Sequence, residues 1–159
     1  MSDPDWHDVT ATTAAELDEV ATQIHDCPFE ADDVVFDAPG RALTVPFRRF
    51  GFDAERRIGS SAIRVDYEFP WRRSFLRVHN ATAHRVDDRA GIGTYGLLDV
   101  QCDADRSAVR IVSVPEHEIE TDVERLEVAV EHTDQVLGTG RRSSWLGRVY
   151  KYDKSVRPQ

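Results

Sequence analysis

Three consecutive residues, His25, Asp26 and Cys27, have side chains that serve as nucleophile, base or metal ligand in enzymes. A cysteine nucleophile needs a histidine that reaches its sulfur, and neighbouring residues rarely face one another in that way. A histidine at the end of a helix is also favoured by the helix dipole alone. We therefore predict no catalytic residue, and an enzyme that uses His25 and Asp26 stays an alternative.

His79 and His84, with Cys102, form a second candidate group. The four residues between the two histidines match the histidine half of a zinc motif, but no cysteine pair supplies the other half. On an extended strand an odd spacing places two side chains on opposite faces. We predict no metal site and no cofactor, and an enzyme built on the His79/His84 pair belongs to the same alternative.

Gly91 to Gly96 matches the pattern G-x-G-x-x-G. In dinucleotide-binding proteins the third glycine opens a helix whose N-terminus holds the pyrophosphate. Here residues 97–102 alternate between apolar and polar side chains as in a strand, so the motif predicts a glycine-rich turn and no nucleotide site.

Arginines alternate with aromatic residues in two further segments, and these give the candidate binding residues Arg48, Arg49, Trp71, Arg72 and Arg73. Aromatic rings beside cations bind single-stranded nucleic acid, often on small β-barrels. The alternative is that the rings point inward while the arginines pair with acidic segments. A net charge of −9 favours this second interpretation over nucleic-acid binding.

Charge alternates along the chain in four blocks. Residues 1–40 hold eleven acids and no Lys or Arg, and residues 41–80 hold nine Arg against four acids. Residues 81–135 hold thirteen acids against five bases, and residues 136–159 hold six bases against one acid. Such blocks either pair with each other on folding or present patches of opposite sign to a partner.

One helix and a series of strands must position these residues. Thr13 and Glu16 form a capping box, and Leu17, Val20, Ala21 and Ile24 then recur as one apolar stripe of a helix. Period-two alternation predicts strands at residues 34–36, 43–47, 63–69, 75–86, 98–102, 109–114 and 126–132. We expect a polar loop at 51–60, a turn at 70–73 and a break near Asn80.

This pattern predicts a mainly β protein, an antiparallel sandwich or barrel of about seven strands with one N-terminal helix. Residues 1–137 would form a single domain, and residues 138–159 a basic, partly packed segment. The N-terminal residues lack the basic and then apolar pattern of a secretory signal peptide, and no apolar run reaches membrane-spanning length. We therefore expect a cytoplasmic protein without a membrane partner.

The order of Ile24-His25-Asp26, Val35-Phe36-Asp37, Leu43 to Phe47, Leu76-Arg77-Val78 and Tyr95 to Val100 resembles small bacterial β-rich domains, some similar to immunity proteins of toxin systems. The resemblance covers residues 17–132 and implies a protein without enzymatic activity that binds another protein. Our leading hypothesis is thus a non-catalytic binding domain whose partner is another protein, with single-stranded nucleic acid as the alternative partner.

Overall fold

The computed structural model describes residues 5–158. Its elements in chain order are β1 (Val9–Ala11), α1 (Leu17–Ile24), β2 (Pro28–Glu30), η1 (Ala31–Asp33), β3 (Val35–Asp37), β4 (Ala42–Phe50), η2 (Phe52–Ala54), β5 (Arg56–Ser60), β6 (Arg64–His79), β7 (Ala81–Asp88), β8 (Thr94–Asp103), β9 (Ala108–Val114), β10 (His117–Val123), β11 (Val128–Trp145) and β12 (Val149–Arg157).

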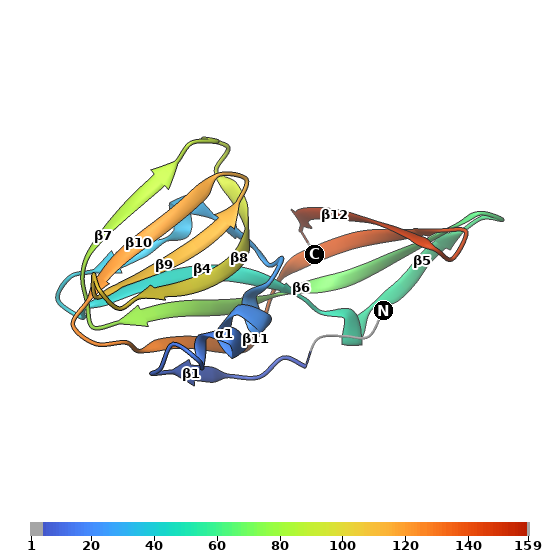
Figure 1. Cartoon of the computed structure of the whole chain (residues 1–159). Helices are drawn as coiled ribbons and strands as arrows, with labels where there is room; N and C mark the ends of the chain where they lie inside the picture. The colour runs from blue at the N-terminus through green and yellow to red at the C-terminus, as the bar shows by residue number, and fades with distance from the viewer. Residues whose placement is uncertain (1–4, 159) are drawn as a thin grey trace. The chain divides into compact units, whose positions relative to one another are not determined.

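The strands form two antiparallel sheets (Figure 1). The larger has the order β1-β11-β6-β4-β3, with β12 added to β11 and β5 added to β6, and the smaller has the order β2-β8-β9-β10-β7. The predicted mainly β, antiparallel class with one α-helix is confirmed for the described residues. Residues 5–158 form twelve strands, so the prediction of about seven was too low.

The chain divides into two compact units. Among the described residues, the sandwich unit holds Asp5–Phe47 and Ser74–His132, and the ribbon unit holds residues 48–73 and 133–158. The boundaries fall inside β4, β6 and β11. The boundary predicted at 137/138 likewise lies inside β11.

The sandwich unit encloses the main apolar core. Inward residues of β4, β6 and β11 meet those of β8, β9 and β10, and α1 adds Leu17, Val20 and Ile24 to the same cluster. Only half of the predicted capping box is present. Glu16 N–H donates to Thr13 Oγ1 at 3.3 Å, but the Glu16 carboxylate accepts the Thr13 hydroxyl at 3.0 Å instead of the Thr13 N–H, and the N-cap of α1 is Glu16 itself. Those bonds lower the pKa of Glu16.

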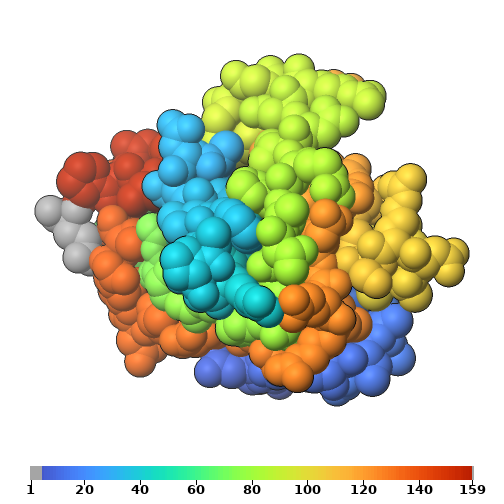
Figure 2. Space-filling model, turned by 90° about the vertical axis from the view of Figure 1, so that its left-hand side faces the viewer, coloured from blue at the N-terminus to red at the C-terminus, as the bar shows by residue number. Residues whose placement is uncertain are grey.

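The predicted break at Asn80 is also confirmed. Asn80 has φ of 56°, a conformation that asparagine tolerates better than most residues, and it separates β6 from β7. In Figure 2 the turn between β3 and β4 (cyan) lies beside the β6–β7 (green) and β10–β11 (orange) connections. Arg41 ties them together by accepting the Ala81 N–H at 3.0 Å and pairing with Glu124 at 2.8 Å.

The ribbon unit contains β5, β12 and the adjoining lengths of β6 and β11, in the order β5-β6-β11-β12. The predicted turn at 70–73 is wrong, since β6 runs through it. Pro70 O accepts the Gly51 N–H at 3.0 Å. Proline has no N–H to donate to a neighbouring strand, and Pro70 is tolerated inside β6 because β4 has already ended at Phe50 on that side. The predicted loop at 51–60 is also wrong, since it contains η2 and β5.

Candidate binding surface of the ribbon unit

All five candidate binding residues belong to the ribbon unit. Two of them hold the C-terminal strand: Arg48 Nη2 donates to Lys154 O at 3.1 Å, and Trp71 Nε1 donates to Ser155 O at 3.1 Å. The Arg48 guanidinium lies 5.3 Å from the centre of the Trp71 ring, and both side chains are buried. Arg48 and Trp71 therefore position β12.

Arg49 is buried as well. Its Nη1 donates to Thr133 O at 2.6 Å and to Arg73 O at 3.2 Å, so it joins β4, β6 and β11. The carboxylate of Asp134 lies 3.9 Å from Nη2. Arg49 thus fastens three strands of the ribbon unit together.

Arg72 and Arg73 are half-buried. Arg72 Nη1 pairs with Asp53 at 2.7 Å, and its side chain is 19% exposed. Binding through the five candidate residues stays a prediction, but burial of Arg48, Arg49 and Trp71 means that a surface on this unit must use other basic side chains too.

The aromatic residues of the ribbon unit pack against one another. Phe50 lies 5.0 Å from Phe52, 4.8 Å from Trp71 and 5.9 Å from Tyr152, measured between ring centres, and Phe52 lies 5.0 Å from Phe69. These contacts cover ring faces that a nucleic-acid base would need for stacking.

Arg142 completes this cluster from β11. Its guanidinium lies 4.9 Å from the Phe52 ring, 5.0 Å from Tyr67 and 4.9 Å from Tyr150. Its Nε and Nη2 each donate to the Glu55 carboxylate at 2.6 Å, and the two side chains are 10% and 11% exposed. Burial acts to lower the pKa of Arg142, but the Glu55 carboxylate outweighs burial and the pKa is raised.

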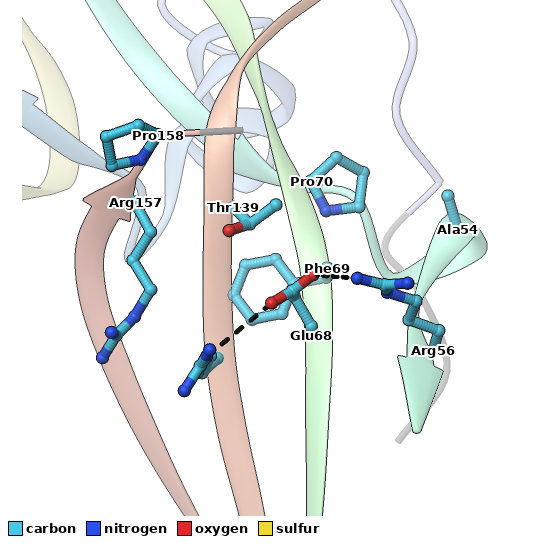
Figure 3. A pocket seen from close by; sticks show the side chains of 9 residues that line it. Ala54, Arg56, Glu68, Phe69, Pro70, Thr139, Arg157 and Pro158 are labelled. Carbon is cyan, nitrogen blue, oxygen red and sulfur yellow. Dashed lines mark hydrogen bonds and ion pairs between the residues drawn. The ribbon is translucent and has the colours of Figure 1, made fainter. Parts of the chain in front are cut away.

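A pocket of about 540 Å³ opens on one face of the ribbon (Figure 3). Strand register places Arg56 directly opposite Glu68 and Thr139 directly opposite Arg157. Glu68 is shared, since it lies 2.8 Å from Arg56 Nη2 and 3.7 Å from Arg141 Nε. Ala54, Phe69, Pro70 and Pro158 complete the lining.

The two units carry opposite charge. Residues 48–73 and 133–158 hold thirteen Arg or Lys against six Asp or Glu, a net charge of +7. Residues 5–47 and 74–132 hold seven basic residues against twenty-two acids, a net charge of −15. The alternation seen along the sequence is therefore sorted by folding into one basic and one acidic unit.

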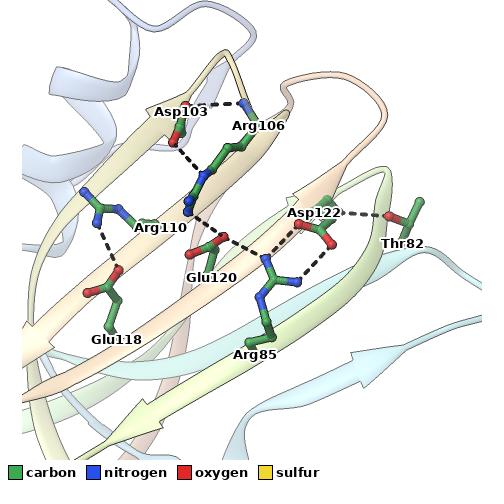
Figure 4. Close-up of polar contacts among 8 residues, drawn as sticks. All are labelled: Thr82, Arg85, Asp103, Arg106, Arg110, Glu118, Glu120 and Asp122. Atoms are coloured by element: carbon green, nitrogen blue, oxygen red, sulfur yellow. Dashed lines mark hydrogen bonds and ion pairs between the residues drawn. The ribbon is translucent and has the colours of Figure 1, made fainter.

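The sandwich unit uses most of its arginines internally. On the outer face of its smaller sheet, Arg85 binds Glu120 at 2.7 Å and Asp122 at 2.8 Å, and Arg110 lies 3.3 Å from Glu118 (Figure 4). The pKa of Arg85 is raised by these bonds, chiefly by Asp122. The acidic strand β10 lies between β9 and β7, so its carboxylates are neutralised by arginines of neighbouring strands.

Several basic residues of the ribbon unit differ in this respect. Arg57, Arg148 and Lys154 are exposed, and within residues 5–158 their side chains form no ion pair. With Arg56, Arg141 and Arg157 of the pocket, they give this unit an accessible cationic surface.

The histidine groups lie elsewhere, in the sandwich unit. His25 Nε2 is 3.6 Å from Asp26 and both side chains are exposed, whereas Cys27 is fully buried. His79 lies 4.0 Å from Glu127, and the His84 ring packs on Phe36 at 4.7 Å. Over the described part of the chain, no three His, Cys, Asp or Glu side chains are grouped to hold a metal ion.

Two further histidines of the sandwich unit, His132 half-buried and His117 buried, have no predicted role. His132 joins Ser74 Oγ at 2.7 Å to Gln23 Oε1 at 2.8 Å. His117 is 3% exposed beside Tyr95, and burial lowers its pKa. Their only sequence signal is a polar residue at an inward position of a strand, a signal that gives no function.

The one α-helix of the described residues is eight residues long, too short to cross a bilayer. The G-x-G-x-x-G segment leads into β8, a strand, as its alternation indicates. Comparison of the chain with protein-family models, with curated proteins and with solved structures found no match.

Proposed function

We infer that this protein is a non-catalytic binding protein, and that its ribbon unit contacts an acidic surface of another protein. The observation that carries the proposal is the sorting of charge: a net +7 on the ribbon unit, with exposed arginines and lysines that no carboxylate of the described residues neutralises. Complementary charge steers association and fixes the orientation of a partner.

The packing of the aromatic rings favours a protein partner over single-stranded nucleic acid. A stacking platform needs ring faces open to solvent, but Phe69 and Trp71 are fully buried and Phe50 and Phe52 stack on each other. Trp145 is covered by Arg64 at 5.1 Å and Lys151 at 5.6 Å. The cationic surface remains as the feature that nucleic acid would use.

The test is affinity capture from a lysate of the cells that make the protein, with wild type and two charge-reversed variants. Arg57→Glu combined with Arg148→Glu removes exposed charge from the ribbon unit. Arg89→Glu combined with Arg125→Glu makes the same change in charge on exposed residues of the sandwich unit. Protein and nucleic acid in each eluate are quantified.

A stoichiometric protein that is captured by wild type and by the Arg89/Arg125 variant, but lost with the Arg57/Arg148 variant, supports the proposal. Equal capture by both variants contradicts it. Nucleic acid that elutes steeply with salt and is lost with the Arg57/Arg148 variant would replace the protein partner by the nucleic-acid alternative.

A further inference from the structure

The pocket on the ribbon is lined by three arginines and one carboxylate. Its basic residues come from three different strands, Arg56 from β5, Arg141 from β11 and Arg157 from β12, while Glu68 rises from β6 between them (Figure 3). The Glu68 side chain is 13% exposed, whereas those of Arg56, Arg141 and Arg157 are 74%, 45% and 44% exposed. The carboxylate is thus covered, and the guanidinium groups are open to the hollow.

The charge of the pocket matches one negative charge. Glu68 is shared by Arg56 and Arg141, and Arg157 Nη2 is paired with Asp153 at 2.7 Å. Three guanidinium groups against two carboxylates leave a net charge of +1. A carboxylate balances this charge, whereas a phosphate dianion would meet the repulsion of Glu68 with one charge left over.

Guanidinium groups also have more donors than their present partners use. Each has five N–H donors in a planar fork that matches a carboxylate. Phe69, Pro70 and Ala54 also line the pocket and add apolar surface to it. A short aliphatic stem that ends in a carboxylate fits both features.

We propose that this pocket binds the carboxylate of an acidic side chain, Glu or Asp, presented by the protein partner, with Arg141 and Arg157 as its ligands and Thr139, directly opposite Arg157, beside them. This deepens the proposed function and rests on it for the identity of the partner. The pocket makes the cationic surface selective, because it distinguishes a projecting carboxylate from a diffuse negative field.

The experiment titrates the full chain with the capped peptide acetyl-Ala-Glu-Ala-amide, which has no terminal charges, and follows the backbone and arginine Nε–H signals by NMR. The peptide acetyl-Ala-Gln-Ala-amide is the uncharged control. Arg141→Gln and Arg157→Gln each remove one proposed ligand. Arg125→Gln is the matched control, since Arg125 is an exposed arginine of the sandwich unit and does not line the pocket.

We expect the Glu peptide to shift the signals of Thr139, Arg141 and Arg157 while the Gln peptide leaves them in place. Each ligand variant should weaken binding at least fivefold, as expected for loss of a charge-assisted contact, and Arg125→Gln should change it less than twofold. Equal binding of the two peptides, or unchanged affinity in both ligand variants, overturns the proposal. So does tighter binding of inorganic phosphate or of a short thymidine oligonucleotide.

The same variants separate this proposal from the proposed function. If partner capture is lost with the Arg57/Arg148 variant and kept with Arg141→Gln and Arg157→Gln, the pocket proposal fails while the binding surface stands. If the peptide binds as expected and no ribbon variant alters capture, the proposed function fails and the carboxylate site stands.

Discussion

The pair of Arg142 and Glu55 gives the sharpest test of how the ribbon unit is held together. Glu55→Gln keeps the size of the side chain but removes the negative charge that faces a guanidinium only 10% exposed. Of the two charge-assisted bonds of 2.6 Å, the amide oxygen of glutamine can accept one. The buried cation loses its counter-charge, and removing one partner of a buried pair costs about 3 kcal/mol or more.

We therefore expect Glu55→Gln to lower the free energy of unfolding by about 3 kcal/mol, measured by urea denaturation and tryptophan fluorescence at pH 7. Adding Arg142→Met should recover most of that loss, because the methionine side chain suits the surrounding rings. The matched control is Glu118→Gln, whose partner Arg110 lies at 3.3 Å with both side chains more than a third exposed, and it should cost less than about 1 kcal/mol. Equal losses for Glu55→Gln and Glu118→Gln would refute the reasoning.

Three further predictions concern single residues. Burial lowers the pKa of His117 from 6.5, so below pH 6.5 the unfolded chain binds a proton more readily than the folded chain, and the protein becomes less stable as the pH decreases. His117→Phe should remove at most about 1.4 kcal/mol per pH unit of that slope. Gly140→Ala would place a Cβ 2.6 Å from two buried rings and should cost about 1–3 kcal/mol, read as a lower Tm. The pKa of Asp153 is lowered to about 2 by Ser155 and Arg157, so the stability it provides is present above its ordinary 3.8 and lost as pH falls toward 2; Asp153→Asn should flatten that acid limb.

The controls for these predictions come from the same molecule. Identical pH slopes of wild type and His117→Phe between pH 7.5 and 5.5 would contradict the assignment to His117. Gly91→Ala meets no neighbouring atom, so it should cost only the strain of its φ of +64°, about 1 kcal/mol. A smaller loss for Gly140→Ala than for Gly91→Ala would be inconsistent with crowding of the rings.

Local patterns were enough to predict much of the sandwich unit. The apolar stripe of the helix and the break at Asn80 are properties of neighbouring residues, and both occur in the structure, as does the Glu16 N–H to Thr13 Oγ1 half of the capping box. Alternation likewise predicted the strand class, since most strands of this unit have one face in the core.

The ribbon unit was harder to predict because long-range contacts override its local signals. Pro70 to Arg73 have turn-forming composition, yet they stay extended because Trp71 is buried against β12. The burial of Arg48 depends on a carbonyl of Lys154, more than a hundred residues away. The pocket combines Arg56, Arg141 and Arg157, and strand order and register, which the sequence does not display, bring them together.

The division of β6 and β11 between two units has a consequence for the order of folding. The ribbon unit needs residues 48–73 and 133–158, and all of residues 74–132 separate them in the chain. Pairing β6 with β11 therefore closes a long loop, which is entropically costly and slow. During synthesis on the ribosome, Phe69 and Trp71 stay exposed to solvent until β11 and β12 have been synthesised. The nascent chain therefore presents exposed aromatic side chains and an unpaired strand edge, an aggregation-prone surface of the kind that chaperones bind.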